Sequence, residues 1–125
     1  KLAAVQKGYY RDDYIRYFVS RPANRPPLIN RGHYSRVASV RKMVSQFLVT
    51  CRQQGKPPQI VNFGGGLDST FFCLAAHGTA PEGGYYEVDL PEVVKLKQSH
   101  IAKHPALKAL INSRSSGISP DSGGG

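Results

Sequence analysis

Apolar residues recur at helical spacing in two stretches of the first half of the chain. In residues 34–53 they form one face of a predicted helix, and most basic residues lie elsewhere; the apolar positions are Val37, Val40, Val44, Phe47 and Leu48. Gly55 and the two prolines after Lys56 predict the end of this helix. A shorter helix is expected over residues 12–19, followed by a proline-rich loop over 21–27.

The second half of the chain alternates between short apolar runs and helical segments. The runs at residues 59–63 and 85–89 are strand candidates, and helices are expected over 68–76 and from Pro91 onward. This alternation is typical of a parallel α/β sheet. Because two strands are too few for a stable doubly wound sheet, we expect an α/β fold whose sheet is incomplete.

The pattern divides the chain into three segments. We expect a helical segment over residues 1–58, a β-α-β-α unit over 59–111 and a disordered tail over 112–125, where serine and glycine predominate. The chain begins at Lys1 and ends in three glycines. We therefore expect it to be a piece of a longer protein.

Positive charge is concentrated in the first segment. Residues 1–58 hold 12 lysines and arginines against two aspartates, whereas residues 59–125 hold five basic against six acidic residues. The first segment therefore suits an anionic partner such as a carboxylate, an acidic peptide or RNA, although a solvated basic surface fits equally well. The sequence has no apolar run of about 18 residues, so we expect no membrane-spanning helix and no membrane partner.

Cysteine and histidine give no sign of a metal site. Cys51 and Cys73 are too far apart for a metal-ligand pair and are expected to be reduced and buried, which favours a cytoplasmic location. The histidines do not cluster at ligand spacing, and His100 and His104 lack a third partner. We expect no metal.

A glycine-rich turn joins the first predicted strand to the helix that follows. Gly64, Gly65 and Gly66 allow a sharp turn and a close approach of the backbone to a ligand, although many loops without a ligand share this composition. Ser69 stands where a dinucleotide-binding motif has its third glycine. The turn therefore disfavours a dinucleotide pyrophosphate and leaves room for a ligand without phosphates.

An acidic residue follows at the end of the second predicted strand. Asp89 lies 23 residues after Gly66, a spacing at which a carboxylate accepts hydrogen bonds from ribose hydroxyls. Two alternatives stay open: Asp89 instead caps the helix that begins at Pro91, or Glu87 takes the ribose-binding role.

Three motifs in order resemble those of the leucine carboxyl methyltransferase family. They are Ile-Asn-Arg-Gly-His-Tyr-Ser-Arg at residues 29–36, the glycine turn with its flanks at 59–71, and Glu-Val-Asp-Leu-Pro at 87–91. The resemblance covers residues 1 to 103. The chain departs from the family pattern at Cys73, where arginine is usual, and at His33, where tyrosine is common.

This resemblance implies the start of a Rossmann-like, S-adenosylmethionine-dependent methyltransferase fold preceded by helices. It also implies that S-adenosyl-L-methionine is the cofactor and assigns its ligands. Lys1 and Arg36 would bind the methionine carboxylate, residues Gly64, Gly65 and Gly66 would line the cofactor, and Asp89 would hold its ribose. Arg31 and Tyr34 would lie near the site or, equally, on the helix surface.

Family members resemble enzymes that methylate the C-terminal leucine carboxylate of the protein phosphatase 2A catalytic subunit. The phosphatase tail is therefore the expected partner of a monomeric enzyme. A sister group that acts on transfer RNA in wybutosine synthesis is the first alternative, and nucleic acid is a partner only under it. An inactive truncated binding protein is the second. Because a carboxylate is ionised at neutral pH, no general base or other catalytic residue is expected.

Overall fold

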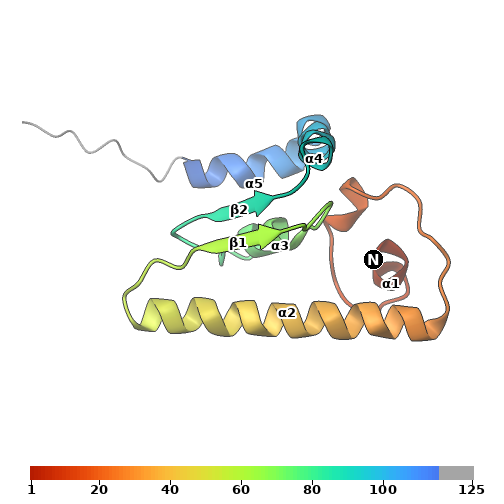
Figure 1. Ribbon diagram of the computed structural model, residues 1–125, viewed down its shortest axis with the longest axis horizontal. Coiled ribbons are helices and arrows are strands. Elements are labelled where there is room, and N and C mark those ends of the chain that lie inside the picture. Colours follow the sequence, from red (N-terminus) through yellow and green to blue (C-terminus); the bar gives the residue numbers. More distant parts are fainter. Residues whose placement is uncertain (116–125) are drawn as a thin grey trace, which may run out of the picture.

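Two short parallel strands form the centre of the fold (Figure 1). The computed structural model describes residues 1–115. Strand β1 (Ile60–Phe63) pairs with β2 (Tyr85–Val88), and Ile60 lies opposite Tyr85. Parallel strands need a crossover, and here α3 (Thr70–Ala76) supplies it. The predicted α/β arrangement with a parallel sheet is confirmed.

Helices flank this sheet on both edges. The long helix α2 (Pro27–Gln53) runs along the β1 side, whereas α4 (Pro91–Lys103) and α5 (Pro105–Ser115) lie on the β2 side (Figure 1). The short helix α1 (Leu2–Gln6) contacts α2, and α5 contacts both α3 and α4. Within residues 1–115 none of the helices combines the length and the apolarity that crossing a bilayer requires.

Helix α2 begins earlier than its apolar pattern predicts. It starts at Pro27 rather than at residue 34, because a proline fits the first turn, where a backbone N–H has no partner within the helix. The buried Asn30 side chain donates a hydrogen bond to the carbonyl of Arg25 at 3.1 Å and fixes this start. The predicted end is confirmed, since Gly55 adopts φ +65° just after the helix.

The helix predicted over residues 12–19 is wrong. Only a single 3₁₀ turn, η1 (Ile15–Tyr17), forms there. The buried Asp12 carboxylate accepts hydrogen bonds from the backbone N–H groups of Tyr14 (3.1 Å) and Ile15 (3.0 Å), as the residue before a helix does, but only this one turn follows. Asp12 is also bound by the hydroxyl of Ser69 at 2.6 Å, which holds this segment against α3.

The apolar core lies between η1, α3 and α5. Phe18, Phe72 and Leu107 are its buried members, and Ile101 of α4 packs against them. Helices α1 and α5 were not predicted. Because α5 continues through Ser115, the expected disorder does not hold at residues 112–115, and the rest of the predicted tail lies outside the described residues.

Both cysteines carry free thiols. Cys51 lies on α2 and Cys73 on α3, and each is partly exposed. The expectation that they are buried is therefore wrong.

Candidate functional site

The turn after β1 holds two glycines in the left-handed backbone region and a third close to the Asn62 side chain. Gly64 and Gly66 have φ values of +65° and +59°, a region that side chains with a Cβ disfavour. A Cβ on Gly65 would collide with the Asn62 amide. The Gly64 N–H donates to the carbonyl of Val88 at 2.8 Å, so the turn stays attached to β2.

Asp89 meets this turn directly. One oxygen of its carboxylate accepts a hydrogen bond from the N–H of Gly66 at 2.8 Å, and the other accepts one from the N–H of Leu90 at 2.8 Å. The N-cap residue of α4 is Leu90, which makes no side-chain cap bond, so the alternative role of Asp89 as the cap is wrong. Each carboxylate oxygen has a second lone pair left for another donor.

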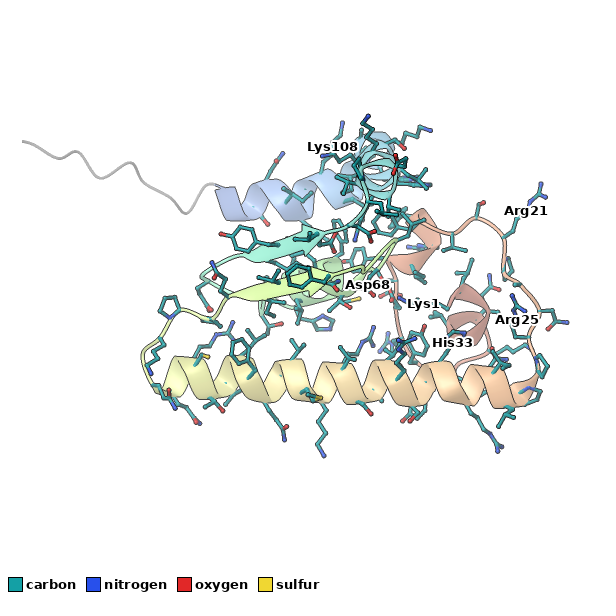
Figure 2. The ribbon with its side chains drawn as sticks, in the orientation of Figure 1. Lys1, Arg21, Arg25, His33, Asp68 and Lys108 are labelled. Carbon is teal, nitrogen blue, oxygen red and sulfur yellow. The ribbon has the colours of Figure 1, made fainter. Side chains whose placement is uncertain are left out.

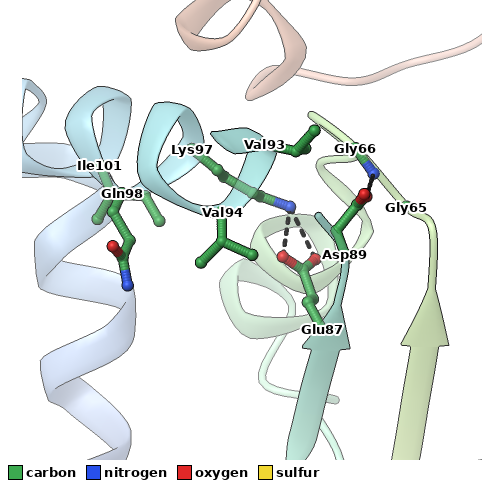
Figure 3. A pocket seen from close by; sticks show the side chains of 9 residues that line it. All are labelled: Gly65, Gly66, Glu87, Asp89, Val93, Val94, Lys97, Gln98 and Ile101. Atoms are coloured by element: carbon green, nitrogen blue, oxygen red, sulfur yellow. Dashed lines mark hydrogen bonds and ion pairs between the residues drawn. The ribbon is translucent and has the colours of Figure 1, made fainter. Parts of the chain in front are cut away.

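A pocket of about 170 Å³ opens beside Asp89 (Figure 3). We call it the Asp89 pocket; Gly65, Gly66, Glu87, Asp89, Val93, Val94, Lys97, Gln98 and Ile101 line it. One end presents carboxylates and glycine backbone, and the inward face of α4 supplies apolar side chains. Such a combination of apolar wall and few polar groups is typical of small-molecule sites.

Glu87 is already paired inside this pocket. The ammonium of Lys97 lies 2.6 Å and 2.7 Å from its two carboxylate oxygens, and Figure 3 shows Lys97 reaching from α4 to Glu87. Among the described residues Asp89 forms no ion pair. Sequence reasoning missed Lys97, although its place four residues after Val93 puts it on the same inward face of α4.

A second, larger pocket of about 500 Å³ lies between α2 and the sheet. We call it the Arg36 pocket, and its lining includes Lys1, Arg36, Gly64 and Gly65. The two pockets therefore share Gly65. Figure 2 shows Lys1, His33 and Asp68, which also line it, between α2 and the strands. Among the predicted site residues, Lys1 and Arg36 therefore line the Arg36 pocket, and Asp89 lines the Asp89 pocket.

The two cations of the Arg36 pocket differ in their partners. The Lys1 ammonium forms an ion pair with the Asp68 carboxylate at 3.1 Å. The exposed Arg36 side chain has no hydrogen-bond or ion-pair partner among residues 1–113, the part of the chain whose side chains are described. Arg36 is thus free to pair with a ligand anion, whereas Lys1 would share its charge with Asp68.

Two groups that line the Arg36 pocket, Asp68 and His33, have shifted pKa values. Burial alone would raise the pKa of the Asp68 carboxyl, but hydrogen bonds from Thr70 and the charge of Lys1 hold it below its ordinary value. The pKa of His33 is lowered by desolvation and by nearby positive charges, including Lys1 and Arg36. The pocket therefore favours a negatively charged ligand group.

Other predicted residues take no part in either pocket. Arg31 and Tyr34 are exposed on α2 and line neither of them. In the described part of the chain no three histidine, cysteine or acidic side chains gather in a way that would hold a metal ion. Sequence reasoning also missed Arg41, which lines the Arg36 pocket and donates to the carbonyl of Arg11 at 2.7 Å.

Comparison with known proteins identifies the family of this chain. A family model described as leucine carboxyl methyltransferase matches residues 2–116. The leucine carboxyl methyltransferase 1 homolog of Arabidopsis thaliana is 42% identical over 123 residues, covering 98% of this chain and 36% of that protein. Leucine carboxyl methyltransferase 1 of Rattus norvegicus is 38% identical over 110 residues, covering 86% of this chain and 31% of that protein.

A third relative carries a different name. The tRNA wybutosine-synthesizing protein 4 of Homo sapiens is 36% identical over 112 residues, covering 88% of this chain and 16% of that protein. The chain thus spans about a third of the length of the first two relatives and about a sixth of the third. Since the family model matches nearly the whole chain, this protein belongs to the leucine carboxyl methyltransferase family.

Proposed function

We propose that this chain forms the cofactor-binding part of an S-adenosylmethionine-dependent methyltransferase whose acceptor is the C-terminal leucine carboxylate of the protein phosphatase 2A catalytic subunit. Family membership supports carboxyl methyl transfer, and the names of the plant and rat relatives support a leucine carboxylate as acceptor. The observation that carries the proposal is the meeting of two unlike pockets at Gly65.

The Asp89 pocket suits the adenosine part of the cofactor. An ionised carboxylate accepts hydrogen bonds from both hydroxyls of a ribose, and Asp89 keeps free lone pairs beyond its bonds to Gly66 and Leu90. Val93, Val94 and Ile101 supply apolar surface for a flat base. The same carboxylate would repel a phosphorylated ribose.

The Arg36 pocket suits the amino-acid part. A guanidinium pairs with a planar carboxylate through two parallel hydrogen bonds, and Arg36 has no competing partner in the described residues. Lys1 adds a second positive charge, which Asp68 keeps in place at 3.1 Å. Because Gly65 lines both pockets, one ligand passing over the glycine turn would reach both ends.

Bound S-adenosylmethionine would supply an electrophilic methyl group. An acceptor carboxylate is already ionised at neutral pH, so this chain need not remove a proton from it. The residues described here would act by holding the two ends of the cofactor and fixing its orientation. We therefore assign none of these residues a catalytic role.

Transfer RNA is a second candidate acceptor. The human relative is named for wybutosine synthesis on transfer RNA, and residues 1–58 carry 12 basic against two acidic side chains. A positively charged surface of this kind favours a phosphate backbone as readily as an acidic peptide.

Calorimetric titration of the purified chain with S-adenosylmethionine and S-adenosylhomocysteine tests the cofactor site. Micromolar binding is expected, and a folded chain that binds neither would contradict the proposal. Transfer of a labelled methyl group is then compared between a phosphatase tail peptide ending in leucine, the same peptide with an amidated terminus, and transfer RNA. Labelling of the first alone supports the leucine carboxylate; binding without transfer to any acceptor indicates an inactive binding protein.

A further inference from the structure

Lys97 is a basic residue of α4 that the fold buries. Its side chain carries only 8% of its possible exposure. Its ammonium contacts the two carboxylate oxygens of Glu87 at 2.6 Å and 2.7 Å, and it donates to the backbone carbonyl of Asp68 at 2.6 Å. The same ammonium lies 5.5 Å from the centre of the Phe18 ring.

These contacts leave the ammonium no capacity for a ligand. A lysine ammonium has three donors, and two carboxylate oxygens and one carbonyl match them. Burying such a charge is costly unless it is paired and hydrogen-bonded. Lys97 therefore acts on other residues: it joins α4 to β2 through Glu87 and to the end of the glycine turn through Asp68.

The glycine turn is attached to the β2 side at two further points. The Asp89 carboxylate holds the N–H of Gly66 at 2.8 Å, and the Lys97 ammonium holds the carbonyl of Asp68 at 2.6 Å. The Asp68 carboxylate in turn pairs with Lys1 at 3.1 Å in the Arg36 pocket. The backbone that Lys97 fixes therefore carries the side chain that positions Lys1.

We infer that Lys97 is a positioning residue, which sets the end of the glycine turn so that Asp68 and Lys1 can receive the amino-acid end of the cofactor. This inference rests on the proposed function and names a residue of that same site. Lys97 also lines the Asp89 pocket, but its ammonium bonds Glu87 and Asp68 rather than Asp89, whose bond to Gly66 holds the adenosine end. Loss of Lys97 should thus weaken binding of the amino-acid end more than binding of adenosine.

A simpler role for Lys97 would be to neutralise Glu87. Glu87 belongs to β2 and Asp89 follows the end of that strand, and both carboxylates line the Asp89 pocket. Without Lys97 an unpaired Glu87 carboxylate would stand near Asp89. Replacing Glu87 by glutamine removes that charge, but it does not restore the bond to the Asp68 carbonyl, so a double variant separates the two roles.

The binding test uses Lys97→Met, Glu87→Gln and the double variant in the full chain, with Lys95→Met as the matched control because Lys95 is exposed on the same helix. Lys97→Met is expected to bind S-adenosylhomocysteine about tenfold more weakly, with a smaller loss for adenosine. The double variant should keep this loss, and Lys95→Met should show none. Equal losses for both ligands, or recovery in the double variant, would overturn the inference.

Amide hydrogen exchange without ligand separates this inference from the proposed function. Both variants lacking Lys97 should exchange faster than wild type at residues 64–70, with the exchange of α2 unchanged. The double variant leaves no unpaired carboxylate at Glu87 and so keeps the test open where Lys97→Met fails to fold. Unchanged exchange at residues 64–70 in both variants would overturn the role of Lys97, even if wild type binds the cofactor. Faster exchange in the variants, together with a wild type that never binds the cofactor, would refute the proposed function alone.

Discussion

The Asp89 carboxylate accepts a hydrogen bond from the backbone N–H of Gly66 at 2.8 Å, and this bond joins the segments that follow the two strands. Parallel pairing of β1 with β2 brings both segments to the same edge of the sheet. Ligands of open α/β sheets bind outside this edge. The bond therefore places an acidic acceptor and a glycine backbone where one ligand can contact both.

Replacing Asp89 tests this arrangement. Asp89→Ala should weaken binding of S-adenosylmethionine about 10- to 100-fold, because a charged acceptor of hydrogen bonds is lost. Asp89→Asn should lie between, since its amide keeps one acceptor oxygen. Calorimetric titration measures both, with the exposed Glu92→Gln as the control. Unchanged affinity in Asp89→Ala would remove this residue from the cofactor site.

Two glycines in different backbone conformations should respond to alanine in opposite directions. Gly66 has φ +59°, so Gly66→Ala should lower the free energy of unfolding by about 1–2 kcal/mol. Gly32 lies inside α2 with open space around the position of a Cβ. Gly32→Ala should raise the free energy of unfolding by up to about 1 kcal/mol, because alanine favours the helix. Urea unfolding followed by circular dichroism measures both, and equal stability of the two variants would contradict the argument.

Local patterns in the sequence were sufficient to predict that the glycine turn and Asp89 lie side by side. Each strand is a short run with one polar residue among apolar ones, and the glycines and Asp89 follow the strands directly, so parallel pairing brings them together. The contact between Lys97 and Glu87 needed the orientation of α4 as well. A pattern of spacing places Lys97 on the inward face but does not indicate that Glu87 lies opposite it.

Residues 12–19 show why part of the fold escaped prediction. Their apolar spacing suits a helix, but Asp12 is bound by Ser69, which lies 57 residues further along the chain. The same carboxylate accepts hydrogen bonds from the backbone N–H groups of Tyr14 and Ile15, and a single 3₁₀ turn follows it. No local pattern in the sequence predicts that Ser69 lies beside Asp12.

The Asp12 contacts predict a large difference between two neighbouring aspartates. Asp12→Ala leaves the Ser69 hydroxyl and two backbone N–H groups without their acceptor, and it removes the partner 3.7 Å from the Arg41 guanidinium. The free energy of unfolding should fall by about 2–4 kcal/mol. Asp13 is exposed, so Asp13→Ala should change it by less than about 0.5 kcal/mol. Urea unfolding measures the free energy of unfolding of both variants, and similar losses in the two would show that the Asp12 contacts contribute little.

His33 reports on the charge of the Arg36 pocket. Desolvation and nearby positive charges, including Lys1 and Arg36, lower its pKa from 6.5. In the pH range between this lowered value and 6.5 the unfolded chain binds more protons than the folded chain does, so stability rises with pH. The contribution of His33 is fully present above 6.5 and is lost as the pH falls through the folded pKa.

The lowered pKa of His33 can be tested by two measurements. Between about pH 7.5 and about pH 5, His33→Gln should lose less stability than wild type, because the glutamine does not titrate, and His77→Gln serves as the exposed control. In an NMR titration Arg36→Ala should raise the pKa of His33, since one neighbouring positive charge is gone. Saturation with S-adenosylhomocysteine should also raise it, because a carboxylate beside Arg36 favours the protonated imidazole. An unchanged His33 pKa in the saturated complex would show that the amino-acid end of the ligand binds elsewhere.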